Sequence, residues 1–136
     1  MQHLEDELPF DVPQEAKLTF KAVCLQNGIL DLSSRKMNAI APYLIEKDWK
    51  KTSYAECLSP KTYAKMLPPC LLVTSITDAH KRDTNQLAWQ LKLKGTRYSV
   101  HSANNLFAKE SFAARHPETR YAQAVNTAML AFFENK

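Results

Sequence analysis

The sequence predicts an α/β protein of one domain, with about three parallel strands and flanking helices. Short apolar runs suited to strands alternate along the chain with segments whose apolar residues recur at helical spacing. This alternation of strands and helices is typical of a parallel sheet whose strands are joined by crossover helices. A length of 136 residues suits one domain, and a hydrophobic content of 45% supports a sizeable core.

Three segments are predicted to be strands. Residues 18–26 (LTFKAVCLQ) mix β-branched, aromatic and apolar side chains in a run short enough for a buried strand. Residues 70–76 (CLLVTSI) form a short apolar run, and residues 96–102 (TRYSVHS) form the third candidate. The turn NGILDLSS follows the first strand, and Gly28 is the position expected to take a positive φ.

Three segments have the spacing of helices. Residues 35–50 show it around Pro42, which interrupts the pattern. The second helix is predicted to have Asp83 as its N-cap and Gly95 as its stop. The last helix is predicted to begin near Pro117. Its apolar stripe consists of Tyr121, Val125, Ala128, Met129 and Phe132.

Charge and cysteine content exclude several classes of protein. The net charge of +4 comes from scattered basic residues, and no basic run alternates with aromatic residues, so we expect no nucleic-acid partner. Cys24, Cys57 and Cys70 form no C-x-x-C pair, and two of them lie in apolar runs typical of buried thiols. No apolar run approaches the ~20 residues that span a membrane, and residues 1–13 contain no apolar signal core. We therefore expect a cytoplasmic protein without a membrane span, and no cofactor.

Two stretches of the sequence carry a resemblance to a known family. They are LQNGILDLS after the first strand and ECLSPKTYAKMLPPCLLVTSITD, which contains the second. With this spacing, the chain from about Leu18 to Phe133 resembles the C-terminal half of an α/β-hydrolase, closest to the hormone-sensitive-lipase-like esterases. The resemblance implies a partial α/β-hydrolase fold for residues 18–136, a cap-like insertion at 34–60, and an N-terminal lead-in at 1–17.

The resemblance gives Asp78 the position of the acid in the catalytic triad, followed by Asp83 as the second aspartate of the family's pattern. In that position a carboxylate orients a histidine and stabilises its imidazolium form. The residues alone favour an aspartate that bonds turn amides at the end of a strand. The sequence leaves both interpretations open.

The histidine of the family's triad has no clear counterpart. Its position falls in HSANNLF, where the resemblance places Asn105. An amide does not titrate near neutral pH, so Asn105 cannot transfer a proton. His101 would reach the same place only after a shift in register. His80 is expected on the surface of the loop that carries Asp78. The spacing of Asp78, His80 and Asp83 matches that of a metal site only loosely.

The sequence contains no nucleophile elbow. The G-x-S-x-G motif needs glycines because its strained turn must fit between a strand and a helix. The chain has two glycines, Gly28 and Gly95, and neither flanks a serine at this spacing. Cys24 lies in the middle of a predicted strand without a neighbouring glycine, so it is interpreted as a structural thiol. The HGGG-type oxyanion stretch of the family is also missing.

These observations predict a carboxylesterase- or lipase-type α/β-hydrolase chain that is a truncated pseudoenzyme, without hydrolase activity on its own. One alternative is a non-catalytic module for binding or assembly, with a small ester-like molecule as its ligand. Another is one half of a split esterase that a second chain completes. The strand at 18–26 is expected to have an open edge, which predicts a homodimer or larger homo-oligomer formed through that edge.

Overall fold

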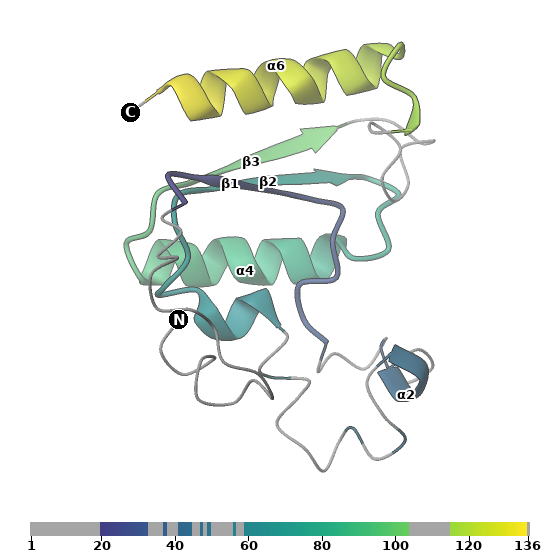
Figure 1. Cartoon of the computed structure of the whole chain (residues 1–136), viewed down its shortest axis with the longest axis vertical. Helices are drawn as coiled ribbons and strands as arrows, with labels where there is room; N and C mark the ends of the chain where they lie inside the picture. The colour runs from purple at the N-terminus through teal and green to yellow at the C-terminus, as the bar shows by residue number, and fades with distance from the viewer. Residues whose placement is uncertain are drawn as a thin grey trace, which may run out of the picture.

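The protein forms a three-stranded parallel sheet covered by helices on both faces (Figure 1). The computed structural model describes residues 20–32, 37, 41–44, 47, 49, 56, 59–103 and 115–135. In chain order the elements are β1 (Val23–Gln26), α2 (Ala41–Leu44), the 3-10 helix η3 (Pro60–Tyr63), β2 (Cys70–Ser75), α4 (Lys81–Leu93), β3 (Tyr98–Ala103) and α6 (Arg120–Glu134). The predicted fold class, with three parallel strands and flanking helices, is confirmed.

The strand β2 lies in the centre of the sheet, in the order β1-β2-β3. Val23 of β1 lies opposite Cys70, and Cys70 lies opposite Tyr98 of β3. All six residues of β2 are buried. A nearly continuous apolar run of this kind is typical of a strand that is covered on both faces. The strand β1 is shorter than the predicted segment 18–26, because residues 20–22 are not part of the sheet.

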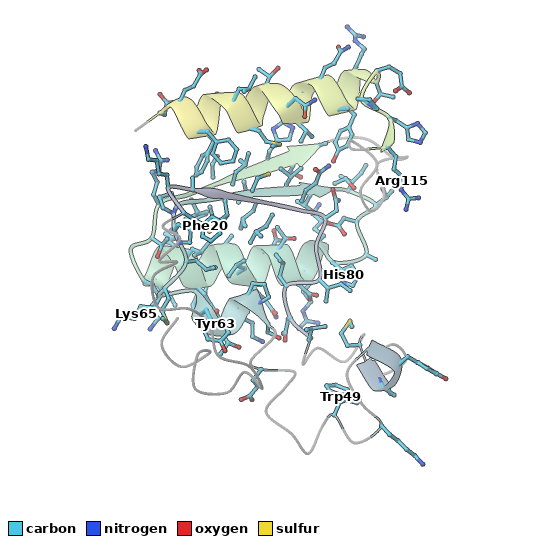
Figure 2. The ribbon with its side chains drawn as sticks, viewed as in Figure 1. Phe20, Trp49, Tyr63, Lys65, His80 and Arg115 are labelled. Atoms are coloured by element: carbon cyan, nitrogen blue, oxygen red, sulfur yellow. The ribbon has the colours of Figure 1, made fainter. Side chains whose placement is uncertain are left out.

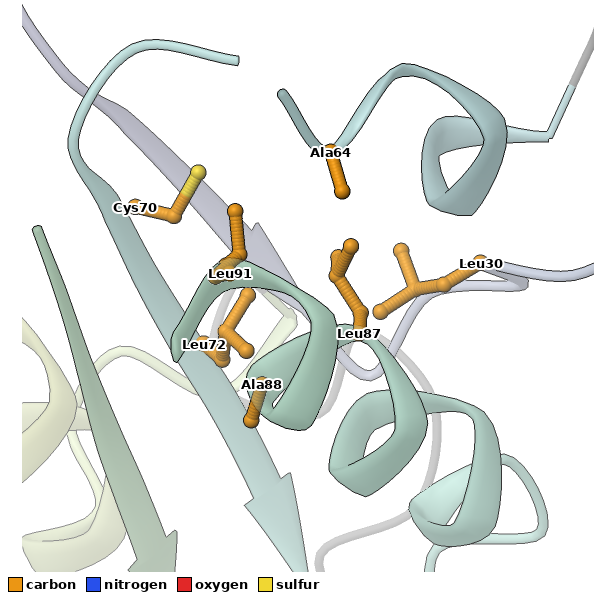
Figure 3. Close-up of a cluster of buried hydrophobic side chains, with 7 residues drawn as sticks. All are labelled: Leu30, Ala64, Cys70, Leu72, Leu87, Ala88 and Leu91. Atoms are coloured by element: carbon orange, nitrogen blue, oxygen red, sulfur yellow. The ribbon is translucent and has the colours of Figure 1, made fainter. Parts of the chain in front are cut away.

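Alternate side chains of β2 enter two separate cores. Cys70 and Leu72 face α4, where they pack with Leu87 and Leu91 (Figure 3). The two leucines of α4 are four residues apart, so they lie on one face of the helix. Leu30, Ala64 and Ala88 complete this cluster. The first core therefore joins the sheet, α4 and the segment that follows η3.

The second core lies between the opposite face of the sheet and α6. Leu71 and Val73 of β2 pack there against Tyr121, Ala122 and Val125. Figure 1 shows the resulting layers, with α6 on one side of the sheet and α4 with η3 on the other. The predicted apolar stripe of the last helix is confirmed, since its remaining members, Ala128, Met129 and Phe132, pack against the same cluster.

The ends of α4 show where the sequence prediction was right and where it was wrong. The helix begins at Lys81 with His80 as its N-cap, so Asp83 lies inside the first turn and is not the cap. The predicted stop at Gly95 is confirmed by its φ of +70°. The N–H of Gly95 donates to the carbonyl of Lys92 at 3.2 Å, and the N–H of Thr96 donates to that of Leu91 at 3.0 Å. This pair of hydrogen bonds is the Schellman motif.

Two further local predictions need correction. The residue with positive φ in the turn after β1 is Asn27, at φ 45°, and not Gly28. Asparagine tolerates this conformation better than other residues with a side chain. The last helix begins at Arg120 rather than near Pro117, and its N-cap is Thr119, whose hydroxyl accepts the N–H of Ala122 at 3.3 Å.

The predicted lead-in at 1–17 lies outside the described residues, and most of the predicted insertion at 34–60 does too. Within the described part of that insertion, α2 has Pro42 in its first turn, where proline is tolerated. Met37 and Trp49 are buried together in a third cluster, against Ile29 and Leu32. The N–H of Leu32 donates to Ser59 Oγ at 2.9 Å. The loop after β1 is thus tied to the segment that leads into η3.

The burial of Cys70 makes stability sensitive to alkaline pH. Burial raises the pKa of this thiol from its ordinary value of 9.0 to about 11. Above pH 9 the unfolded chain loses the proton and the folded chain keeps it, so the free energy of unfolding should fall as the pH rises towards 11. Below pH 9 this contribution is constant.

Urea unfolding across this pH range measures the effect, with Cys70→Ala as the comparison. The variant leaves a small cavity that lowers stability at every pH, so the quantity to compare is the slope. We expect a shallower alkaline slope in Cys70→Ala, and equal slopes in both proteins would contradict the assignment.

Candidate functional site

The candidate site lies at the carboxyl ends of β1 and β2. Asp78 follows the last residue of β2 by three positions and is only 7% exposed. In open sheets with parallel strands, ligands bind outside the carboxyl ends of the strands. Figure 2 shows His80, the N-cap of α4, at this end of the molecule, and Phe20 and Lys65 towards the other. Asp78 is thus a buried carboxylate just beyond a buried strand, and its place as a triad acid stays a prediction.

Both carboxylate oxygens of Asp78 are hydrogen-bonded. The hydroxyl of Thr74 donates to Oδ2 at 2.7 Å, and the backbone N–H of His80 donates to Oδ1 at 2.8 Å. The second contact confirms that Asp78 bonds a turn amide, as the alternative interpretation predicted. A carboxylate has about four acceptor positions, so these two donors leave room for further ones. The contacts hold the side chain in one orientation at the end of the central strand.

The side chain of His80 is directed to Asp83 and not to Asp78. Its Nδ1 lies 3.4 Å from Asp83 Oδ2, and the residue is only 8% exposed, so the expectation of a surface position was wrong. The hydroxyl of Thr84 donates to the His80 carbonyl at 3.4 Å. Within the described residues, no group of three or more histidine, cysteine, aspartate or glutamate side chains is arranged to hold a metal ion.

The structure places only one of the two residues considered for the position of the triad histidine, Asn105 and His101. Asn105 lies outside the described residues, so its predicted place is untested. His101 lies inside β3, opposite Val73, and not in the loop after the strand. In the part of the chain that the structure describes, no imidazole hydrogen-bonds to Asp78.

Sequence reasoning missed two polar residues at this site, Tyr121 and Asn27. The Tyr121 hydroxyl donates to Asn27 Oδ1 at 3.5 Å, across from α6 to the end of β1. Burial raises the pKa of the phenol, and the negative charge of Asp78 raises it further. In the sequence Tyr121 belongs to the apolar stripe of the last helix, and its hydroxyl is the only signal of a second role. The structure therefore brings it within the electrostatic influence of Asp78.

Two buried amide groups at the end of β1 add donors to the site. Gln26 Nε2 and Asn27 Nδ2 are both buried and have no hydrogen-bond partner within the described residues. A buried donor without a partner costs about 1–3 kcal/mol. The N–H of Asn27 donates to the carbonyl of Val73 at 2.8 Å, so its backbone is fixed to the sheet. These amide groups are suited to donate to an oxygen atom supplied from outside the described residues.

The environment of Cys24 does not suit a nucleophile. The residue lies within β1 and packs against the core beneath α6. Burial raises the pKa of its thiol, which disfavours the reactive thiolate near neutral pH. The structural interpretation of this cysteine is supported.

The parallel sheet with helices on both faces matches part of an α/β-hydrolase fold. Solved structures of esterase B from Lactobacillus rhamnosis have this fold. One, with a C6-C4 SN3 inhibitor, matches with a TM-score of 0.77 and 18% identity over 98% of this chain and 46% of the esterase. Another, from strain HN001, matches with a TM-score of 0.70 and 19% identity over 87% of this chain and 41% of the esterase.

A third structure of the same esterase, inhibited by a C4-C4 SN3 tributyrin phosphonate, has a TM-score of 0.71 and 20% identity, over 87% of this chain and 40% of the esterase. The shared property at these identities is the fold, and the chain spans less than half the length of the esterases. No family profile and no curated protein sequence matches the chain. No helix in the described residues is long and apolar enough to cross a membrane.

The contact between Thr74 and Asp78 predicts a measurable coupling. Removing the carboxylate in Asp78→Ala leaves a buried hydroxyl and a turn N–H without their acceptor, which should cost about 1–3 kcal/mol. Thr74→Val should cost less, because His80 still donates to Asp78. In a double-mutant cycle the two effects should be non-additive by about 0.5–3 kcal/mol. Urea unfolding of the four proteins measures the coupling, and additive effects would show that the hydrogen bond contributes nothing.

Proposed function

We propose that this chain is the C-terminal half of a carboxylesterase-type α/β-hydrolase, with Asp78 in the position of the triad acid. The observation that carries the proposal is a buried carboxylate held at the carboxyl end of the central strand by Thr74 and a turn amide. A triad acid has to be fixed in orientation before it can orient a histidine. The match to the esterase fold supports the same assignment.

In this proposal the chain has no hydrolase activity by itself. Its 136 residues contain no G-x-S-x-G motif, and Asn105 stands where the resemblance places the histidine. Without a nucleophile and its base, neither the covalent intermediate nor the proton transfer of an esterase can occur. In this proposal Asp78 keeps its structural contacts while the proton-transfer partner is lacking.

Two alternatives share the same geometry. As a binding module, the chain would take a small ester-like molecule whose oxygen accepts from the buried amides of Gln26 and Asn27, with Tyr121 at the same end of the sheet. As half of a split esterase, it would receive the nucleophile from another chain. A cytoplasmic location stays a prediction.

Ester hydrolysis tests the proposal directly. The purified 136-residue chain should hydrolyse short-chain aryl esters no faster than its Asp78→Ala variant. Asn105→His alone should not restore turnover, because no elbow serine is present for the new imidazole to deprotonate. Initial rates over a range of ester concentrations measure this. Saturable turnover that disappears in Asp78→Ala would contradict the proposal and indicate a nucleophile elsewhere in the chain.

We further propose that the outer edge of β1 pairs with another strand. When the chain is purified alone, a second copy of the chain supplies that strand. Within the described residues β1 pairs only with β2. The N–H groups of Val23 and Asn27 donate to the segment containing β2, so alternation directs the N–H of Gln26 outward. Val23 itself packs against the core beneath α4. A charge at Val23 would therefore damage the core, and Gln26 is the better position for a test.

Gln26→Pro should weaken this association, because proline removes the outward donor without removing a bond to β2. Light scattering during size-exclusion chromatography should show a homodimer or larger assembly for the parent chain, and a shift towards monomer for the variant. Gln26→Thr, which keeps the N–H, is the control. A parent chain that elutes as a monomer at micromolar concentration would rule out the pairing.

A further inference from the structure

The outer side of α4 carries an exposed tryptophan between two shallow hollows. Trp89 is 62% exposed and Leu93, one turn further along, is 61% exposed. The hollow towards the start of α4 has a volume of about 450 Å³, and the hollow towards η3 has a volume of about 520 Å³. Both are lined by Trp89. Leaving this much of the apolar surface of an indole in water is energetically unfavourable.

The residues around this tryptophan are positively charged. Lys65, Lys81, Arg82 and Lys94 line the hollows, and none of them forms an ion pair within the described residues. Lys61 also lines the hollow beside η3, but it is paired with Asp31. Among the described residues, no aspartate or glutamate lines either hollow. The Trp89 surface, defined as Trp89, Leu93 and these four unpaired cations, therefore suits an acidic segment that also carries apolar side chains.

We propose that residues 4–15 of the same chain dock on the Trp89 surface. This segment, LEDELPFDVPQE, contains five carboxylates, and residues 1–16 contain no lysine or arginine. The whole chain has a net charge of +4, of which residues 1–16 contribute −5, so the remaining residues carry +9. Apolar residues alternate with the carboxylates in the segment, and they match the exposed indole and leucine. They are Leu4, Leu8, Phe10 and Val12.

The place where the described chain begins allows this contact. Phe20 precedes β1, and the N–H of Val23 donates to the carbonyl of Pro69 at 2.9 Å, which places the start of β1 close to the segment that carries Lys65. Figure 2 shows Phe20 and Lys65 towards the same end of the molecule. Ten extended residues span up to about 33–36 Å, whereas a helix of the length of α4 measures about 20 Å. Residues 4–15 can therefore reach the whole Trp89 surface.

Trp89 itself reports on the docking. The chain has two tryptophans, so Trp49→Phe leaves Trp89 as the single emitter. In this background, acrylamide should quench Trp89 slowly at low salt. Quenching should become about twofold faster in 1 M NaCl, where the Debye length is about 3 Å. Reversing the charges with Glu5→Lys, Asp6→Lys and Glu7→Lys should have the same effect at low salt. Glu118→Lys with Glu134→Lys, one at an exposed position just before α6 and the other at its exposed last residue, is the control and should leave quenching unchanged.

Zero-length carbodiimide cross-linking of the parent chain gives a second readout that needs no variant. Mass spectrometry should find cross-links from Glu5, Asp6 or Glu7 to Lys65, Lys81 or Lys94. In a mixture of isotope-labelled and unlabelled protein, these links should lie within single chains. Links between labelled and unlabelled chains would overturn the proposal in favour of a second copy. If the quenching rate of Trp89 does not change when the charges of residues 5–7 are reversed, the proposal is wrong. The Trp89 surface would then be open or covered by something other than residues 4–15.

Discussion

The burial of β2 on both faces is the constraint on which the rest of the molecule depends. Its side chains alternate between a core beneath α4 and a core beneath α6, so each helix is held by the same strand from opposite sides. Because each fully buried aliphatic side chain contributes about 1.5–3 kcal/mol, this strand stabilises both layers at once. The turn after it can then hold a carboxylate in a fixed place.

The polar site is a consequence of the sheet. Parallel strands end at the same edge, so Asp78 after β2 and Asn27 after β1 come together there. Tyr121 reaches this edge from α6 because its ring belongs to the second core and its hydroxyl extends beyond it. Burial raises the pKa of Tyr121, and the Asp78 charge at the same edge raises it further. The binding that we propose as an alternative function would take place at this polar edge.

The uneven distribution of charge over the chain concerns a second surface, the outer side of α4. The carboxyl end of the sheet carries buried acidic and amide groups, whereas the outer side of α4 carries, around Trp89, cations that form no ion pair within the described residues. The acidic residues that complement this side lie near the start of the sequence. Apolar burial therefore determines how the layers pack, whereas the docking that we propose for the outer side of α4 depends on charge.

The sequence by itself determined the α/β class, the three strand segments, the stop of α4 at Gly95 and the position of Asp78 beyond a buried strand. These features depend on local properties, namely apolar runs, helical spacing and the freedom of glycine to take positive φ. Only the tertiary structure decided which partners the polar groups have. Asp83 lies inside the first turn of α4 because Asp78 accepts the N–H of His80 and the helix begins earlier. Tyr121 and Asn27 meet only after the layers are packed, and hydrogen bonds between residues distant in sequence leave no local pattern to predict them from.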